Sequence, residues 1–352
     1  MTGIAPALLA WWDVHGRRDL PWQRDPTPYR VWVSEVMLQQ TQVVTVERYY
    51  DRFMAAFPDL QSLAAASEDA VLHAWSGLGY YGRARQLQHA ARRVCEAHGG
   101  ALPMDLDALM ALPGIGRSTA GAILALAGGQ RQPILDGNVK RVLTRLHRIE
   151  EPPATPAVLA RLWQLADQYT PADRPAAYTQ AIMDLGATLC TRRRPACERC
   201  PLAGRCLARQ GGVAETLPAA KPRRARPQRS SVVMLVCLGA GRVLLEKRPA
   251  AGLWGGLWGL PEVEGLDAVG DWCQREIGQP PLRIAQRPVL RHGFTHFDLD
   301  MTPVEVDVPE PRRALDGGRW LWYNLHDPAR VGLAAPVTRL LNSLLQERPA
   351  PR

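Results

Sequence analysis

Four cysteines near the middle of the chain constrain its fold more than any other feature. They lie within seventeen residues in the spacing C-x6-C-x2-C-x5-C, on a loop rich in arginine. Such crowding of thiols indicates a metal site. Structural zinc sites usually pair two short knuckles roughly 12–20 residues apart. One C-x2-C with two wider gaps, and no histidine, favours a 4Fe–4S cluster over zinc, and both over disulfides. The predicted ligands are Cys190, Cys197, Cys200 and Cys206.

Composition and charge indicate a globular protein with a polyanionic partner. The chain has 352 residues, a net charge of +9 and 46% hydrophobic residues, which is enough for two domains with cores. An excess of basic residues is typical of proteins that bind nucleic acids. No apolar stretch approaches the roughly 18 residues of a membrane span, and the N-terminus has no signal-peptide pattern. We expect a cytoplasmic protein, associated with the nucleoid in a bacterium.

The hydrophobic pattern predicts two domains joined by a basic linker. Residues 1–207 should form an all-α domain, 208–229 the linker, and 230–352 a smaller α+β domain. Helical spacing recurs in Tyr29–Tyr50, Ser67–Leu72, Leu106–Leu112, Ser118–Leu126, Val139–Leu146 and Tyr178–Leu189. In the second domain we expect a hairpin of Val232–Leu238 and Arg242–Glu246, and strands Phe294–Asp300, Val304–Val308 and Arg319–Tyr323.

A Gly-x-Gly turn between two helical segments predicts a contact with phosphate. In Leu112–Ala120, Gly114 and Gly116 allow a sharp turn. The free backbone N–H groups at the start of the next helix can then point toward a phosphate. A helix–hairpin–helix of this kind binds a DNA backbone without reading its sequence. An ordinary helix–helix turn is the alternative, but the flanking apolar pattern and the basic charge favour DNA.

Twenty residues further on, Asp136 precedes another predicted helix. A carboxylate there can simply cap the helix. Held rigid and ionised beside a DNA-binding turn, it can also stabilise positive charge developing on a sugar. The local pattern does not separate the two roles. Lys140 and Arg141 offer phosphate contacts.

The order of these motifs resembles the endonuclease III superfamily of base-excision DNA glycosylases. Three further segments are similar to adenine DNA glycosylases of the MutY type: Pro28–Gln42, Gly77–Tyr81 and Phe294–Phe297. The resemblance covers about residues 20 to 325. It implies an enzyme with a helix–hairpin–helix glycosylase domain, a 4Fe–4S loop at 190–206 and a C-terminal Nudix-like domain.

The resemblance also implies roles for single residues. Glu35 matches the catalytic acid, and burial on its apolar helix would raise its pKa. Asp136 matches the carboxylate that stabilises or captures the oxocarbenium sugar, and Asn138 supports it. Residues implied to contact the extruded adenine or the DNA are Gln23, Leu38, Gln39, Gln40, Tyr80, Gly114, Gly116, Ser118, Lys140 and Gln180. Among these, Tyr80 matches an intercalating wedge, and Gln39 or Gln40 a polar plug.

Ser118 separates two subfamilies. Relatives that also cut the DNA strand carry a lysine here, whose amine attacks the sugar. Serine cannot form a Schiff base, so the resemblance implies a monofunctional glycosylase.

The C-terminal domain resembles Nudix pyrophosphatases at Gly252–Glu262. Arg275-Glu276 is not followed by the glutamates that hold magnesium, so we expect no hydrolysis. Thr295 and His296 match a loop that senses 8-oxoguanine, although a plain packing strand is the alternative.

These observations predict a monomeric enzyme that removes adenine opposite 8-oxoguanine or guanine in double-stranded DNA. One alternative is a bifunctional, endonuclease III-like glycosylase and lyase. The other is a non-enzymatic protein that binds damaged DNA.

Overall fold

The computed structural model of the chain describes residues 3–219, 225–239, 241–311, 315 and 318–348. The chain forms two compact units, residues 1–65 with 86–223 and residues 66–85 with 224–352. The first is helical and the second is built on a sheet, which confirms the predicted fold class. The second unit includes the short segment 66–85 in addition to the C-terminal residues. The boundaries at 207 and 230 stay a prediction.

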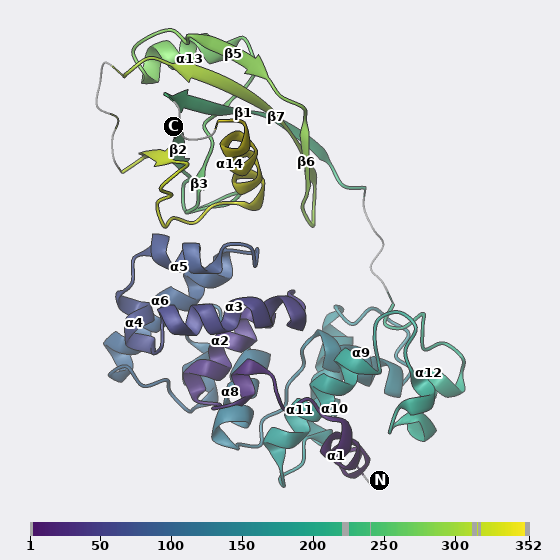
Figure 1. Ribbon diagram of the computed structural model, residues 1–352. Coiled ribbons are helices and arrows are strands. Elements are labelled where there is room, and N and C mark those ends of the chain that lie inside the picture. Colours follow the sequence, from purple (N-terminus) through teal and green to yellow (C-terminus); the bar gives the residue numbers. More distant parts are fainter. Residues whose placement is uncertain (1–2, 220–224, 240, 312–314, 316–317, 349–352) are drawn as a thin grey trace. The chain divides into compact units, whose positions relative to one another are not determined.

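Helices make up the first unit (Figure 1). They are α1 (Ala5–His15), η1 (Pro21–Gln23), α2 (Pro28–Leu38), α3 (Val43–Ala56), α4 (Leu60–Ala65), α6 (Gly82–His98), α7 (Leu106–Met110), α8 (Arg117–Gly128), α9 (Gly137–Leu146), α10 (Pro156–Tyr169), α11 (Pro175–Thr188), η2 (Cys197–Arg199), η3 (Ala203–Arg205) and α12 (Leu207–Gln210). Helix α6 begins at the end of the segment that belongs to the second unit.

Helix α8 lies at the centre because its sequence is made of small and apolar residues. The run Ala120–Ala125 is buried, and Gly121 lies against the backbone of the segment that leads to Asp136. A Cβ added at Gly121 would lie 2.6 Å from the carbonyl oxygen of Pro133. Glycine therefore permits the close approach that brings α8 beside the start of α9.

The single helix suggested by the spacing over 29–50 is two helices. Helix α2 ends at Leu38 and α3 begins at Val43. Between them Gln40 adopts a φ of 58°, and the amide of Thr41 donates to the carbonyl of Leu38 over 3.3 Å. The spacing of apolar residues did not reveal this turn. Residues 39 to 42 are all polar, and polar residues also occur on the exposed face of a continuous helix.

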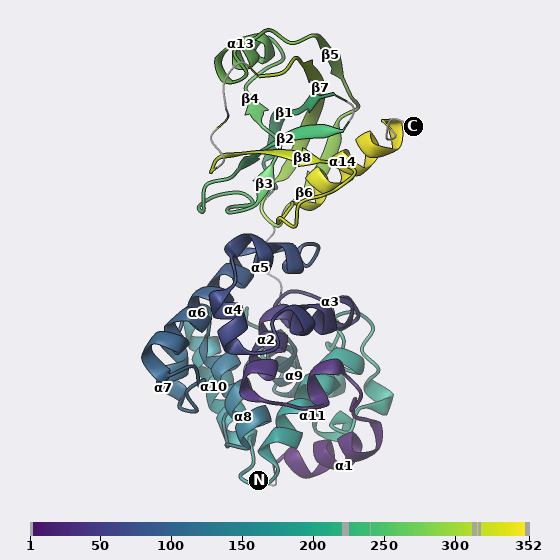
Figure 2. The same ribbon diagram turned by 60° about the vertical axis from the view of Figure 1, so that its left-hand side comes forward.

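The second unit is an eight-stranded sheet with helices α5 (Glu68–Trp75), α13 (Ala268–Glu276) and α14 (Ala335–Glu347) (Figure 2). Its main path is β3-β2-β1-β7-β5, with β4 on β1, β6 on β7 and β8 on β2. The strands are β1 (Gln228–Leu238), β2 (Arg242–Lys247), β3 (Trp258–Gly259), β4 (Glu262–Val263), β5 (Arg283–Gln286), β6 (Leu290–Gly293), β7 (Asp298–Val308) and β8 (Trp320–Asn324).

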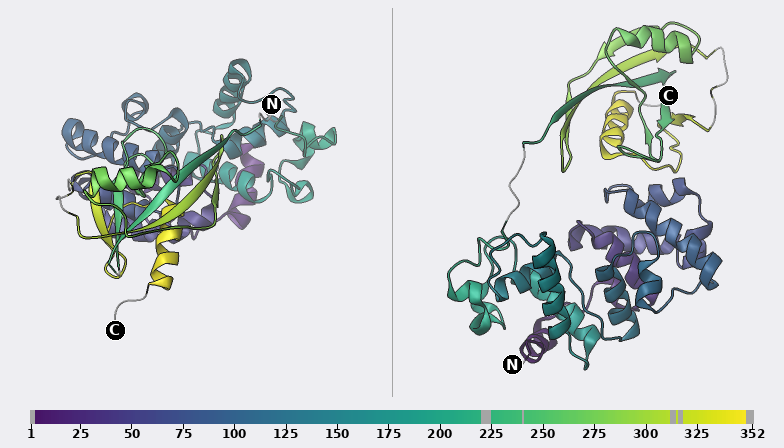
Figure 3. Two further views of the ribbon diagram at one scale, coloured as in Figure 1. Left: turned by 90° about the horizontal axis from the view of Figure 1, so that it is seen from above. Right: turned by 180° about the vertical axis from the view of Figure 1, so that it is seen from behind.

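The long strands β1 and β7 run parallel through the middle of this sheet (Figure 3). The predicted hairpin is confirmed, because β1 and β2 pair antiparallel, with Leu238 opposite Arg242. Residue 240 of its turn lies outside the described residues. The predicted strand Val304–Val308 lies within β7, and the predicted strand Arg319–Tyr323 corresponds to β8, one residue further along the chain.

The predicted strand Phe294–Asp300 is confirmed only at its end, because residues 298–300 belong to β7 and residues 294–297 are not in a strand. Strand β6 ends at Gly293, β7 begins at Asp298, and residues 294–297 form the turn between them. The amide of Phe294 donates to the carbonyl of Phe297 over 2.9 Å, and the two rings stack with centroids 4.6 Å apart. The aromatic residues at 294 and 297 therefore hold a hairpin turn together.

Part of the segment predicted as a linker is packed. Ala208, Ala214 and Leu217 form a small buried cluster beside the cysteine loop. Residues 220–224 of the same segment lie outside the described residues.

We predict that Gly121→Ala destabilises the first unit by about 1–3 kcal/mol, because the added methyl group meets backbone that cannot move without shifting the Asp136 segment. Thermal and urea unfolding measure the change. Gly204→Ala is the control, since a Cβ there meets nothing within 4 Å. Equal stability of the two variants would contradict the close-approach argument.

Candidate active site and iron–sulfur loop

Glu35 is a carboxyl group held in apolar surroundings. It lies on α2 between side chains that are almost completely buried, including Val33, Val36 and Met37. Burial, and to a smaller extent the negative charge of Asp136, raise the pKa of Glu35 to about 8. Glu35 is therefore protonated at neutral pH and can donate a proton.

Asp136 is the N-cap of α9, which is one of the two roles that the sequence predicted for it. Its Oδ1 accepts from the amide of Val139 over 2.7 Å, and its Oδ2 accepts from Nδ2 of Asn138 over 3.3 Å. Burial raises the pKa of this carboxyl, while the two donors and Arg141 act in the opposite direction. Two carboxyl groups thus share a poorly solvated space in which only one ionises easily.

The Gly-x-Gly turn lies between α7 and α8. Gly114 has a φ of 78°. Gly116 is the N-cap of α8 and has an extended backbone, and no side chain at this position accepts a hydrogen bond from the first amides of the helix. Both glycines are exposed. The hydroxyl of Ser118, on the first turn of α8, accepts from the amide of Leu135 over 3.0 Å. The turn therefore presents backbone N–H groups, while Ser118 ties the start of α8 to Leu135, the residue before Asp136.

A cavity of about 270 Å³ brings together two residues that the sequence predicted to contact the base. Gln23 is the last residue of η1, and Gln180 lies on α11, more than 150 residues later in the chain. Aromatic and cationic side chains complete the lining, among them Trp12, Trp22 and Arg17. An apolar cavity with a few polar groups suits a flat heterocycle.

Sequence reasoning missed the group beneath this cavity. The carboxylate of Asp184 is 1% exposed and accepts hydrogen bonds from Trp12, Arg17 and Gln180. The only signal in the sequence was an acid on an apolar helix, four residues after Gln180.

The remaining predicted DNA contacts of the first unit lie at its surface or partly so. Leu38 and Gln39 are half-buried at the end of α2, and Gln40 is exposed in the turn that follows. Lys140 lines a second cavity of about 330 Å³ together with Arg141 and Arg192. Three cations around one depression suit a phosphate.

In the second unit the structure brings together Tyr80 and Thr295. Tyr80 is 49% exposed and has a φ of 49°, which is unusual for a residue with a side chain. Its hydroxyl lies 3.1 Å from Oγ1 of Thr295, in the turn between β6 and β7. His296 is exposed beside it.

The cysteine loop fits a cluster better than a single zinc ion. A tetrahedral Zn–S₄ site would hold its sulfurs about 3.8 Å apart. Among the described residues, no three of the four cysteine sulfurs lie within 4.8 Å of one another. Burial and the other thiols raise the pKa of Cys200 to about 11, so metal binding must supply the thiolate.

Two arginines of α9 hold this loop. Arg145, 1% exposed, donates to the carbonyls of Thr191, Arg192 and Leu217 and lies 3.3 Å from Sγ of Cys190. Arg141 donates to the carbonyl of Cys190 and to Oδ1 of Asn138. A continuous set of hydrogen bonds therefore joins the Asp136 carboxylate to the cysteine loop.

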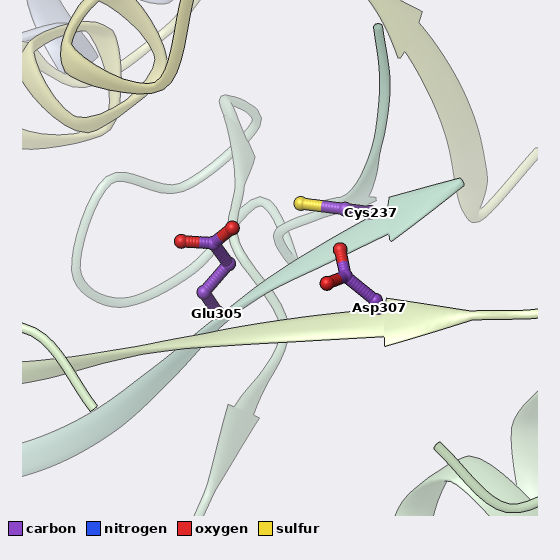
Figure 4. A group of neighbouring side chains, drawn as sticks. All are labelled: Cys237, Glu305 and Asp307. Atoms are coloured by element: carbon purple, nitrogen blue, oxygen red, sulfur yellow. The ribbon is translucent and has the colours of Figure 1, made fainter. Parts of the chain in front are cut away.

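A second group of ligand-type side chains lies on β1 and β7 (Figure 4). Cys237, Glu305 and Asp307 come together because the two strands are parallel, with Cys237 opposite Asp307. Arg287 pairs with Glu305 over 2.8 Å, and Arg348 pairs with both acids. These carboxylates are neutralised by arginines, so the group stabilises the sheet.

Comparisons with known proteins agree with this arrangement. Residues 33–168 match the HhH-GPD superfamily of base-excision DNA repair proteins, 190–206 the iron–sulfur binding domain of endonuclease III, and 232–343 the NUDIX domain. A solved thermostable thymine-DNA glycosylase is 27% identical, with a TM-score of 0.53, over 59% of this chain and 95% of its own. The fold and the site thus define a DNA glycosylase of base-excision repair.

Two relatives identify the particular family. The adenine DNA glycosylase of Buchnera aphidicola (from Acyrthosiphon pisum) is 33% identical over 96% of both chains. The human adenine DNA glycosylase is 40% identical over 95% of this chain and 73% of its own. The chain belongs to the adenine DNA glycosylase family.

Several predictions from the sequence are therefore confirmed. The protein is an enzyme, an adenine DNA glycosylase that binds DNA, and its four-cysteine loop holds a 4Fe–4S cluster. The non-enzymatic alternative is excluded. Among the described residues, no helix is both long and apolar enough to cross a membrane.

We predict that Arg145→Met loses the cluster and lowers the free energy of unfolding by at least about 3 kcal/mol. The variant leaves three carbonyl groups, one buried and two partly buried, without their donor. Iron content follows the cluster, and urea unfolding follows stability. Arg148→Met, which removes an exposed ion pair with Glu150, is the control. Full iron content in Arg145→Met would contradict the anchoring role.

Proposed function

We propose that this adenine DNA glycosylase acts on adenine paired with 8-oxoguanine or guanine, as a monomer and without cutting the DNA strand. The observation that carries the chemistry is the pair Glu35 and Asp136, two carboxyl groups in one poorly solvated space with the pKa of Glu35 raised to about 8. Such a pair supplies an acid and an anion at the same pH.

Glu35 acts as the general acid. Adenine leaves poorly as an anion, but protonation at N7 lets it depart as a neutral base. A protonated carboxyl at neutral pH supplies that proton, and general acid catalysis of this kind contributes about 10²–10⁴ in rate.

Asp136 acts on the sugar. As the C–N bond breaks, positive charge develops on the ring, and the carboxylate stabilises it or captures it briefly before water adds. Val139 and Asn138 hold the carboxylate in place by donating to its two oxygens. Its position is therefore set before the substrate arrives.

The cavity of Gln23 and Gln180 receives the base after it is flipped from the duplex. The Gly114–Gly116 turn binds the DNA backbone through its amides, and the cluster loop presents arginines to the same polyanion. Tyr80 intercalates as a wedge, and Gln39 or Gln40 fills the space of the flipped base. Leu38 packs nearby.

Ser118 leaves the reaction without an amine nucleophile. Its hydroxyl already accepts from Leu135, and no Schiff base forms at this position. This supports a monofunctional enzyme over the bifunctional, endonuclease III-like alternative.

Thr295 and His296 read the opposite base. 8-Oxoguanine differs from guanine by an oxygen at C8 and a hydrogen at N7. The exposed turn between β6 and β7 offers a hydroxyl and an imidazole that can bond this N7–H. Phe294 and Phe297 stack beneath the turn and fix its shape.

We predict that Glu35→Gln lowers single-turnover excision of adenine by at least about 100-fold, because it removes the donated proton and little else. Mispair binding should persist. In the wild type, the rate should fall about tenfold per pH unit above pH 8, as Glu35 loses its proton. Glu150→Gln, an exposed glutamate, is the control. A Glu35→Gln rate within tenfold of wild type would remove Glu35 from the mechanism.

We predict that Ser118→Lys introduces lyase activity by placing an amine beside the opened sugar. Borohydride reduction should then trap a covalent protein–DNA adduct. Ser118→Ala is the matched control, since both variants lose the hydrogen bond to Leu135. If the lysine variant excises adenine but gives no adduct, position 118 does not decide between the two subfamilies.

We predict that Thr295→Val lowers the preference for 8-oxoguanine over guanine roughly tenfold, since one lost hydrogen bond is worth about 1–3 kcal/mol of discrimination. Single-turnover rates on the two mispairs give the ratio. Thr302→Val, within β7, is the control for a valine elsewhere in the sheet. An unchanged ratio for Thr295→Val would assign the turn to packing alone.

A further inference from the structure

The carboxylate of Asp184 is buried and saturated with donors. Its Oδ1 accepts from Nε of Arg17 over 2.9 Å, from Nη2 of Arg17 over 2.6 Å and from Nε2 of Gln180 over 2.9 Å. Its Oδ2 accepts from the amide of Arg17 over 3.0 Å and from Nε1 of Trp12 over 3.1 Å. Every donor that reaches it belongs to a residue that lines the base cavity.

This arrangement determines which way the amide of Gln180 faces. A carboxylate paired with arginine can only accept hydrogen bonds. The amino group of Gln180 must therefore face Asp184, and its carbonyl oxygen must face the other way. Gln180 lines the cavity, so the atom that it presents there is an acceptor.

We propose that Asp184 is a positioning residue that fixes the amide of Gln180, so that the cavity accepts a hydrogen bond from the exocyclic amino group of the base. The inference rests on the proposed excision of adenine. Adenine carries such an amino group at C6. A purine with hydrogen or a carbonyl at C6 leaves the acceptor without a donor, which costs affinity in a desolvated cavity.

The test compares adenine with unsubstituted purine, each opposite 8-oxoguanine, in single-turnover excision. The ratio of the two rates within one protein reflects recognition of the amino group. Comparing that ratio between proteins cancels the different intrinsic reactivities of the two bases. A purely structural role of Asp184 would slow both substrates equally and leave the ratio unchanged.

In Asp184→Asn the introduced amide can donate as well as accept, so Gln180 is free to turn. We expect the preference for adenine over purine to fall about tenfold. In a Gln180→Leu background the same substitution should not change the ratio further. Asp13→Asn, which removes an exposed carboxylate paired with Arg174, is the matched control and should keep the wild-type ratio.

The exchanged pair D184N/Q180E provides a second test that keeps the charge and nearly the same atoms. The amide introduced at position 184 donates to the carboxylate introduced at position 180, whose second oxygen faces the cavity as an acceptor. We expect the preference for adenine to return to within about threefold of wild type. This variant decides the matter even if Asp184→Asn alone does not fold.

A wild-type ratio in folded Asp184→Asn, or no recovery in the exchanged pair, would overturn the inference. Failure of the proposed function looks different, because the wild-type protein itself would then not release adenine from the mispair.

Discussion

The closeness of two carboxyl groups in a space with little water is the constraint on which the catalytic domain depends. Glu35 comes from α2 and Asp136 from the start of α9, and neither has a basic partner that neutralises it completely. Their shared charge is what raises the pKa of Glu35 beyond the effect of burial alone. Small residues on α8 make this closeness possible, because Gly121 lets the backbone before Asp136 approach the helix.

The same helix that begins with Asp136 holds the cysteine loop. Arg141 and Arg145 lie one and two turns later on α9, and both donate to backbone carbonyls of the loop. When the cluster is bound it fixes the shape of this loop, and the arginines pass that constraint to the helix that positions the carboxylate. In this chain hydrogen bonds therefore connect the cysteine loop to the helix that begins at Asp136.

The sequence predicted the features that depend on short, contiguous patterns. The cysteine spacing, the Gly-x-Gly turn, the Asp136 cap and the β1–β2 hairpin all consist of neighbouring residues whose chemistry is local. The sequence did not reveal the break between α2 and α3, because the turn there is made of polar residues. It also predicted a strand over residues 294–297, which form a turn. These errors arise because periodicity does not distinguish side chains that pack in a core from those that stack across a turn.

What the sequence could not predict is contact between distant segments. Asp184 joins α1, the loop after it and α11. No local sequence pattern predicts the five hydrogen bonds that its carboxylate accepts. The sequence gives Arg145 the character of a solvent-exposed helix residue, but the side chain is buried and donates to three backbone carbonyls of distant residues. Buried polar groups gain their meaning from partners far away in the chain, so they appear only in three dimensions.

The most direct test of the account is the pKa of the Glu35 carboxyl itself. Carbon-13 NMR of protein labelled at glutamate side-chain carboxyl groups, with Glu35→Gln to assign the signal, follows its titration. The account predicts a midpoint near pH 8 that moves lower in Asp136→Asn, where the neighbouring negative charge is gone. A midpoint near 4.5 that does not respond to Asp136 would contradict it.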